Sequence, residues 1–261
     1  MFFSEWRRSA TMDQNNKPNN IQKAKPELSV VVLGYAAKKE IIPFVEKLLS
    51  IFQKNSIYDY ELILVANYWP NTGDNTPEYV SELAKNTPNI HSVSFPKKGG
   101  MGWDMKSGLV AAQGDFIAVI DGDGQMPIID LVRVYEIIKL DKSDLAKTYR
   151  ITRGDGLWRK TISHIYNLFF SFLFPGLNAR DINSKPKIFT RAFYEKLRLE
   201  SDGWFIDAEI MLAARRQKAR ISEIPTEFLG LSGKRKSFVR WPAILEFIWN
   251  LIKYRVKEFL K

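Results

Sequence analysis

Short apolar runs alternate with segments of helical spacing along the first half of this chain. The apolar runs are rich in β-branched residues, which is typical of strands buried in a parallel sheet. They are Leu28–Tyr35, Glu61–Asn67, His91–Phe95 and Asp115–Asp121. The helical segments between them are 40–52, 77–85, a helix that follows the glycine-rich turn 97–104, and 131–139. The alternation predicts an α/β fold built on a mostly parallel sheet flanked by helices.

The second half of the chain has a less regular pattern. Helices are predicted over 162–174, from 192, over 207–217 and over 241–261, with a late strand within 219–228. The first 26 residues are rich in Asn, Lys and Gln and predict a disordered leader. We therefore expect a leader over 1–26, one α/β domain over 27–230, and a basic loop with an amphipathic C-terminal helix over 231–261.

Composition removes several classes of function. The 261 residues include no Cys, so a disulfide framework, a thiolate metal site and a Cys nucleophile are excluded. His91 and His164 are the two imidazoles, which excludes a His-rich metal site. The net charge of +10 favours an anionic partner. The basic residues lack an RNA-binding aromatic motif or a recognisable DNA-reading helix, so we expect no nucleic-acid partner.

Two apolar segments raise the question of membrane contact. Neither is a span, because the longest apolar stretch, Ile165–Phe174, is well short of the ~20 residues that a bilayer requires. It fits either a buried core helix or an interfacial helix. The last helix places apolar residues on one face, namely Leu245, Trp249, Ile252, Val256 and Phe259. A basic amphipathic helix lies in a membrane interface or packs on a partner. The chain shows no signal peptide, so we expect a cytoplasmic protein bound peripherally to a membrane face or to an integral partner.

The clearest chemical pattern is VIDGDGQMP, residues 119–127. A buried strand runs directly into Asp121, Asp123 and Gln125. Ligands of open α/β sheets bind at the carboxyl ends of strands. Carboxylate and amide oxygens are ligands that a hard divalent cation prefers. Mg²⁺ usually completes its coordination shell with waters and substrate phosphates. Asp and Gly also favour turns on conformational grounds alone, and that simpler interpretation stays open.

This arrangement resembles family-2 glycosyltransferases of the GT-A fold, a Rossmann-like nucleotide-diphospho-sugar transferase fold. Within them it is similar to the polyprenyl-phosphate transferases, such as dolichyl-phosphate mannose and glucose synthases. The likeness extends over roughly residues 28–241. Its segments are LSVVVLGY, GGMGWDMKSGLVAAQGDFIAVIDGDGQMP, DINSKPKIFTR and GWFIDAEIMLAARRQKARISEIP.

The resemblance implies an inverting transferase that takes a sugar from a UDP or GDP donor. Asp121 and Asp123 match the Asp-x-Asp pair, and Asp123 with Gln125 would hold Mg²⁺ or Mn²⁺ against the diphosphate. Asp121 would lie nearer the ribose or share the metal. The further residues expected at the donor are Tyr35, Asn67, Gly100, Lys106, Lys234 and Arg235.

The resemblance also implies a polyprenyl-phosphate acceptor. The residues expected to grip its phosphate are Arg150, Arg153, Arg159 and Ser163. Asp207 is the third expected catalytic residue. With a phosphate acceptor it would position other groups or bind sugar, because phosphate is largely ionised near pH 7. With a glycan hydroxyl as acceptor, the second hypothesis, it would be the base. It also fits a helix N-cap.

Three departures from the family pattern bear on these expectations. Ala36-Ala37 stands where the family usually has Asn-Glu, and Ala66-Asn67 where it has Asp-Asp. Ser184-Lys185-Pro186 stands in place of Ser-Gly-Phe. Because the alanines remove polar contacts expected at the base and ribose, they favour a third hypothesis, a non-catalytic module that binds a nucleotide sugar or lipid.

Overall fold

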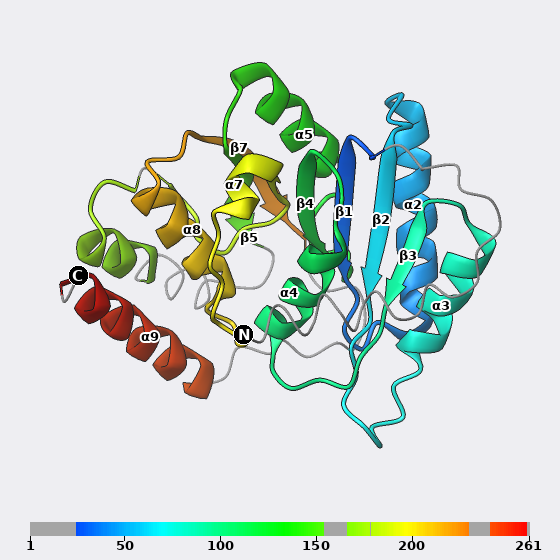
Figure 1. Ribbon diagram of the computed structural model, residues 1–261, viewed down its shortest axis with the longest axis horizontal. Helices are drawn as coiled ribbons and strands as arrows, with labels where there is room; N and C mark the ends of the chain where they lie inside the picture. The colour runs from blue at the N-terminus through cyan, green and yellow to red at the C-terminus, as the bar shows by residue number, and fades with distance from the viewer. Residues whose placement is uncertain (1–24, 154–165, 178, 230–240, 260–261) are drawn as a thin grey trace.

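The computed structural model describes residues 25–153, 166–177, 179–229 and 241–259, and its strands form one seven-stranded sheet (Figure 1). The strands are β1 (Leu28–Leu33), β2 (Tyr60–Val65), β3 (Ile90–Val93), β4 (Phe116–Asp121), β5 (Leu145–Arg153), β6 (Lys187–Thr190) and β7 (Ile221–Phe228). Their order is β3-β2-β1-β4-β6-β5-β7. β6 runs antiparallel to β4 and β5, and the other neighbouring strands are parallel. The mostly parallel sheet predicted from the alternation is confirmed.

The first four strands lie where the apolar runs predict them, within about two residues at each end. β5 and β6 are strands that the hydrophobic pattern did not predict. β5 reads LAKTYRITR, and β6 begins with a lysine. Lys147 and Lys187 are nevertheless buried, each with 1% or less of its surface exposed. Charged residues inside a strand hide it from a search for apolar runs.

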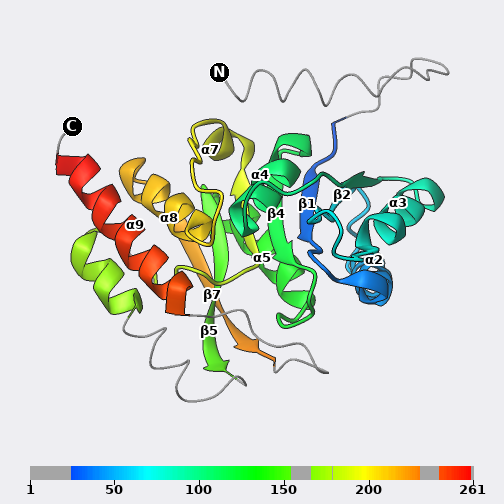
Figure 2. The ribbon, with the colours of Figure 1, turned by 90° about the horizontal axis from the view of Figure 1, so that it is seen from below.

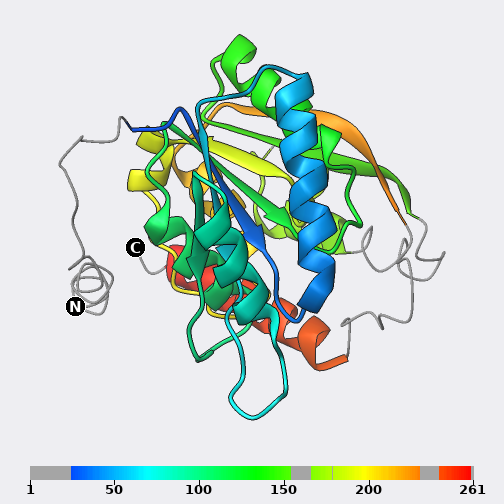
Figure 3. The ribbon, with the colours of Figure 1, turned by 90° about the vertical axis from the view of Figure 1, so that its right-hand side faces the viewer.

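Helices cover both faces of the sheet. They are η1 (Lys38–Glu40), α2 (Ile41–Lys54), α3 (Thr76–Asn86), α4 (Met101–Ala111), α5 (Ile129–Asp141), α7 (Arg191–Glu195), α8 (Ile206–Arg216) and α9 (Trp241–Phe259), with a further helical segment over 166–173. Alternate residues of β1 enter two separate cores. Val30 and Val32 pack with α2, α3 and α5, whereas Val31 packs with α4 and α8. Figure 3 shows α2, in light blue, along its face of the strands.

The C-terminal helix packs beside α8 and the segment 166–173 (Figure 2). Its contacts run through Phe247, Leu251 and Tyr254. The predicted apolar face is turned outward, because Trp249 is 68% exposed and Val256 50%. Among the described residues, no helix is both long and apolar enough to cross a bilayer.

The segment 166–173 is buried on one side and exposed on the other. Phe170 and the adjoining Phe174 are fully buried in the core below α8 and α9. Leu168 and Phe172 point outward and are 65% and 79% exposed. The segment therefore packs on one side as a core helix and presents apolar side chains to solvent on the other.

Candidate active site at the ends of β1 and β4

The order of strands creates a switch point between β1 and β4. From β1 the chain builds β2 and β3 on one side and then returns to place β4 on the other. Leu33 pairs with Asp121 at the carboxyl ends of these strands. The Gly122 N–H donates to the Leu33 carbonyl at 2.9 Å and continues the pairing by one residue. This is the position where open α/β sheets bind ligands.

The acidic turn that follows β4 lies at the solvent edge of this switch point. The Asp121 side chain is 34% exposed, and Asp123 is exposed. The Gln125 N–H donates to Asp123 Oδ1 at 3.0 Å, which forms an Asx turn. Gly124 has φ +72°, a left-handed conformation that glycine adopts without strain. The turn interpretation and the ligand interpretation thus apply to the same residues, as the sequence allowed.

The chemistry of this turn fits a hard divalent cation. Asp121, Asp123 and Gln125 supply two carboxylates and one carboxamide within one short turn, and oxygen ligands are those that Mg²⁺ and Mn²⁺ prefer. Within the described ranges, no group of three His, Cys, Asp or Glu side chains is placed to hold a metal ion. A cation at this rim would therefore need further oxygens from water or from a ligand.

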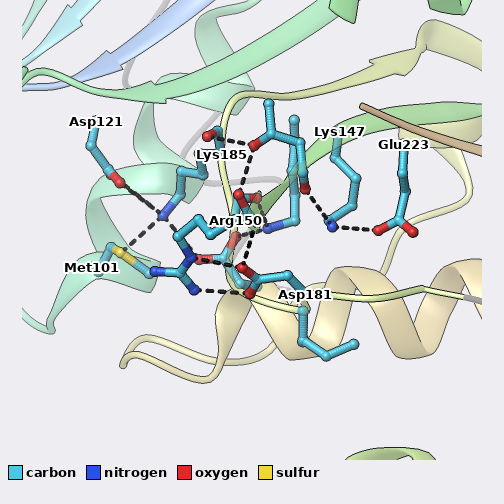
Figure 4. A network of polar contacts seen from close by, with 12 residues as sticks. Met101, Asp121, Lys147, Arg150, Asp181, Lys185 and Glu223 are labelled. Atoms are coloured by element: carbon cyan, nitrogen blue, oxygen red, sulfur yellow. Dashed lines mark hydrogen bonds and ion pairs between the residues drawn. The ribbon is translucent and has the colours of Figure 1, made fainter. Parts of the chain in front are cut away.

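Lys185 lies on the inner side of Asp121 (Figure 4). Its Nζ is 3.3 Å from Asp121 Oδ1 and 3.0 Å from Asp207 Oδ2. The Lys187 ammonium donates to the other oxygen of Asp207 at 2.6 Å. Both lysines come from the antiparallel strand beside β4 and its lead-in, and Asp207 comes from the first turn of α8.

Asp207 is thus buried between two ammonium groups, with 1% of its surface exposed. Burial alone would raise the pKa of this carboxyl, but Lys185 and Lys187 outweigh it and hold the pKa of Asp207 below its usual range. Burial also lowers the pKa of Lys187 to about 8, against the opposing effect of Asp207. In this arrangement Asp207 is a fixed anion that positions two lysines.

Two further ion pairs continue the charged interior along β5. Arg150 donates through Nε and Nη2 to the two oxygens of Asp181, at 2.6 and 2.8 Å. Burial would raise the pKa of Asp181, but the Arg150 fork holds it well below its usual range. Lys147 pairs with Glu223 at 2.8 Å. Arg150, expected at the acceptor phosphate, is therefore engaged with a carboxylate.

The residues expected near a nucleotide base form a separate buried network at the ends of β1 and β2. Asn67 is fully buried, and its amide donates to Asp104 and Ser107 while it accepts from the Phe95 N–H. Lys97 forms an ion pair with Asp104 and lies 4.1 Å from the centre of the Tyr35 ring.

A carboxylate, that of Asp104, lies in this network beside Asn67. Asp104 reaches Asn67 from α4, at a sequence separation that motif matching does not reveal. Burial raises the pKa of Asp104, although Lys97 and Asn67 oppose the shift. Tyr35 is 39% exposed and is the member of the network that presents a face to solvent.

The glycine-rich turn before α4 packs against the loop 201–203. The Gly100 N–H donates to the Asp202 carbonyl at 2.7 Å, and the Gly102 N–H donates to the Gly203 carbonyl at 2.9 Å. A Cβ on Gly102 would lie 2.4 Å from the Ser201 carbonyl oxygen, so a side chain has no room there. Lys106 pairs with Asp202 at 2.5 Å on the same loop. Gly100 and Lys106 thus contact this loop and not the acidic turn.

Glu209 anchors that loop, a role the sequence did not reveal. Its two oxygens accept from the Glu200 and Ser201 N–H groups, each at 2.9 Å, and the Tyr254 hydroxyl donates to the same carboxylate. Residues two apart on a helix face different ways, and Asp207 and Glu209 accordingly have separate partners.

Several expected site residues lie outside the described part of the chain. They are Arg159, Ser163, Lys234 and Arg235. Arg153 is the last residue of β5, and its side chain is not described.

A parallel-rich sheet with an acidic turn at its switch point defines an α/β protein of the GT-A class. A family model described as "Glycosyl transferase family 2" matches residues 29–200. The chain belongs to this family, as the motifs implied.

The chain is also similar in sequence to individual transferases. The chain is 24% identical over 255 residues to a dolichyl-phosphate beta-glucosyltransferase of Trichomonas vaginalis, covering 92% of this chain and 76% of the relative. It is 23% identical to the dolichyl-phosphate beta-glucosyltransferase of Saccharomyces cerevisiae, covering 80% and 68%. An undecaprenyl-phosphate 4-deoxy-4-formamido-L-arabinose transferase of Yersinia enterocolitica is 28% identical, covering 54% and 42%.

Solved structures share the fold. A glucosyl-3-phosphoglycerate synthase of Mycobacterium tuberculosis, in complex with Mn²⁺, UDP and phosphoglyceric acid, matches with a TM-score of 0.63 at 19% identity. The match covers 88% of this chain and 77% of that one. The GT-A fold expected from the sequence is confirmed.

Proposed function

We propose that this chain transfers a sugar from a UDP- or GDP-linked donor to a polyprenyl phosphate at a membrane surface. The observation that carries the proposal is the acidic turn Asp121–Gln125 at the switch point of a family-2 glycosyltransferase fold. The names of the relatives in Trichomonas, yeast and Yersinia support a lipid-phosphate acceptor.

On the donor side, Asp123 and Gln125 would hold Mg²⁺ or Mn²⁺ against the diphosphate, with Asp121 nearer the ribose or sharing the ion. When bound, such a cation neutralises charge on the departing nucleoside diphosphate. Tyr35 offers an exposed ring face toward the base. Lys234 and Arg235 would close over the diphosphate, and Asn67, Gly100 and Lys106 would support the site from behind.

On the acceptor side, the state of Asp207 favours phosphate over a hydroxyl. A hydroxyl nucleophile needs a base that it can reach, whereas Asp207 is buried and both its oxygens are bound by lysines. A phosphate monoester, with a second pKa near 6, is largely ionised at pH 7 and needs no base. Arg153, Arg159 and Ser163 would grip that phosphate, with Arg150 fixed by Asp181.

The transfer would be a single in-line displacement. An oxygen of the acceptor phosphate attacks the anomeric carbon of the sugar as the bond from that carbon to the donor diphosphate breaks. The electron pair leaves with UDP or GDP, and the anomeric centre inverts. The chain's own residues orient the two phosphates on opposite sides of the sugar, which supplies proximity and alignment.

The outward face of α9 supports peripheral contact with a membrane. Ile248, Trp249, Ile252 and Val256 are each at least 38% exposed, and Lys253 and Lys257 are exposed on the same helix. An apolar face beside lysines suits an anionic lipid interface. Replacing both Trp249 and Ile252 with Ser should reduce sedimentation with vesicles of anionic phospholipid at least tenfold. Unchanged sedimentation would count against this contact.

The test of the proposal is a transfer assay with labelled UDP-glucose or GDP-mannose and a polyprenyl phosphate. We expect label in the organic extract for the wild type, and a loss of about a hundredfold for Asp123→Ala. The matched control is Asp115→Ala, which removes an exposed carboxylate from the opposite end of the same strand and should leave transfer unchanged.

Two other outcomes would replace the proposal. Label in a water-soluble glycan would indicate a hydroxyl acceptor. Donor binding without turnover under any acceptor would indicate a non-catalytic module, which the alanines at 36, 37 and 66 favour.

A further inference from the structure

Asp121 has two different sides. On its inner side, Lys185 Nζ lies 3.3 Å from Oδ1 and 3.4 Å from Oδ2, and the lysine side chain is 4% exposed. On its outer side, the Asp121 carboxylate is open to solvent, because a third of this side chain is exposed. The ammonium group therefore contacts the carboxylate from behind and leaves its front accessible.

Lys185 comes from the lead-in to β6. β6 runs antiparallel to β4, with Lys187 opposite Val119. Lys185 lies two residues before this strand begins, and both lysines reach Asp207. At this position the family pattern has glycine, which carries no charge.

Asp121 and Asp207 share Lys185, whose Nζ lies 3.3 Å from Asp121 Oδ1 and 3.0 Å from Asp207 Oδ2. Lys187 already donates to Asp207 at 2.6 Å, whereas Asp121 has Lys185 as its neighbouring ammonium among the described residues. Within the described residues, Lys185 thus brings a buried positive charge to the carboxylate of Asp121, and this charge weakens the attraction of the rim for a divalent cation.

We propose that Lys185 is a positioning residue that fixes Asp121 and keeps the affinity of the rim for a divalent cation low until a donor diphosphate adds its own negative charges. The proposal rests on the proposed function, since it takes the acidic turn as the donor site. Under this proposal the cation and the donor bind cooperatively, because each raises the affinity of the site for the other. The cation does not stay bound when the donor is absent.

The test measures binding of Mn²⁺ alone to the full chain, by electron paramagnetic resonance and without nucleotide. Lys185→Met and Lys185→Gln both remove the charge, and we expect each to bind Mn²⁺ about tenfold more tightly than the wild type. Lys185→Arg keeps the charge and should bind as weakly as the wild type. Circular dichroism at the same temperature identifies the variants that are folded, and either neutral variant suffices.

Lys187→Met is the matched control, because it removes a buried lysine that pairs with the same carboxylate, Asp207, and not with Asp121. Its Mn²⁺ affinity should change less than threefold. Damage to the site would weaken Mn²⁺ binding, so the predicted tightening separates an electrostatic role from a merely structural one. A folded neutral variant that binds Mn²⁺ no more tightly than the wild type overturns the proposal.

Adding UDP distinguishes this failure from failure of the proposed function. We expect UDP to tighten Mn²⁺ binding by a larger factor in the wild type than in Lys185→Met. If neither UDP nor GDP binds any form, the proposed function fails, whereas the Mn²⁺ comparison without nucleotide still decides the role of Lys185.

Discussion

The two halves of the sheet differ in the kind of residue that their strands bury. From β3 to β4 the buried strand residues are mostly apolar, as in VVVL of β1 and IAVI of β4, apart from the buried pair Ser29 and Glu61. In β5 and β6, lysines occupy positions with almost no exposed surface and are paired with Glu223 and Asp207. The acidic turn lies at the seam where β4 meets β6. The comparison shows that the apolar half carries the acidic turn at the end of β4, and that the charged half places buried ion pairs beside this turn.

The sharpest contrast between the halves should appear in stability. Lys147→Met leaves Glu223 without its buried partner and should lower the free energy of unfolding by about 3–5 kcal/mol. Ile63→Val, a conservative deletion in the apolar half, should lower it by about 1 kcal/mol. Urea unfolding measures both.

A double variant sharpens this contrast. Replacing Lys147 and Glu223 together with Met should recover much of the lost stability, because a buried ion pair and an apolar pair of similar volume are often nearly equal in stability. Equal losses for Lys147→Met and Ile63→Val would show that the two halves do not differ as described.

The acidic turn should respond in the opposite way, with a large loss of function and little loss of stability. Asp123→Ala should reduce donor binding measured by calorimetry with Mn²⁺ by about a hundredfold. Because Asp123 is exposed, the free energy of unfolding of this variant should stay within ~0.5 kcal/mol of that of the wild type. Unchanged donor binding would remove the turn from the site.

Acid should weaken the charged half first. The pKa values of Asp181 and Asp207 are held below their usual range in the folded chain. Their contribution to stability is therefore complete above the unfolded pKa, about 3.9, and is lost as pH falls toward the folded values. Urea midpoints measured below about pH 5 should fall more steeply for the wild type than for Asp181→Asn. Parallel curves would contradict this assignment.

The smallest predicted effect concerns the anchor between α8, α9 and the loop 200–203. Tyr254→Phe removes one donor to Glu209 and should lower the free energy of unfolding by about 1 kcal/mol, with faster hydrogen exchange at the Glu200 and Ser201 amides. Tyr58→Phe, at a tyrosine that is 68% exposed, is the control and should change neither.

The same contrast explains what could be predicted from the sequence. β1, β2 and β4 could be predicted because most of their buried residues are consecutive apolar residues. β5 and β6 could not, because Lys147 and Lys187 are buried only through partners that are 76 and 20 residues away. The hydrophobic pattern of a segment indicates which of its own residues are buried. It does not indicate a counter-ion that is distant in the sequence.

The site follows the same rule. The acidic turn was predicted because its position after a buried strand is local information. The burial of Asn67, its hydrogen bond to Asp104 and the contact between Lys185 and Asp121 depend on segments that are distant in the sequence and meet at one edge of the sheet. The glycines before α4 were attributed to a ligand by resemblance, and their described contacts are with the loop 201–203.

The most direct measurement is a crystal structure of the full chain with Mn²⁺ and an intact sugar nucleotide. We predict the diphosphate at the carboxyl ends of β1 and β4, with Asp123 and Gln125 within ~2.0–2.3 Å of the ion and Lys185 still behind Asp121. A donor bound elsewhere, with Asp121, Asp123 and Gln125 facing bulk water, would contradict the account.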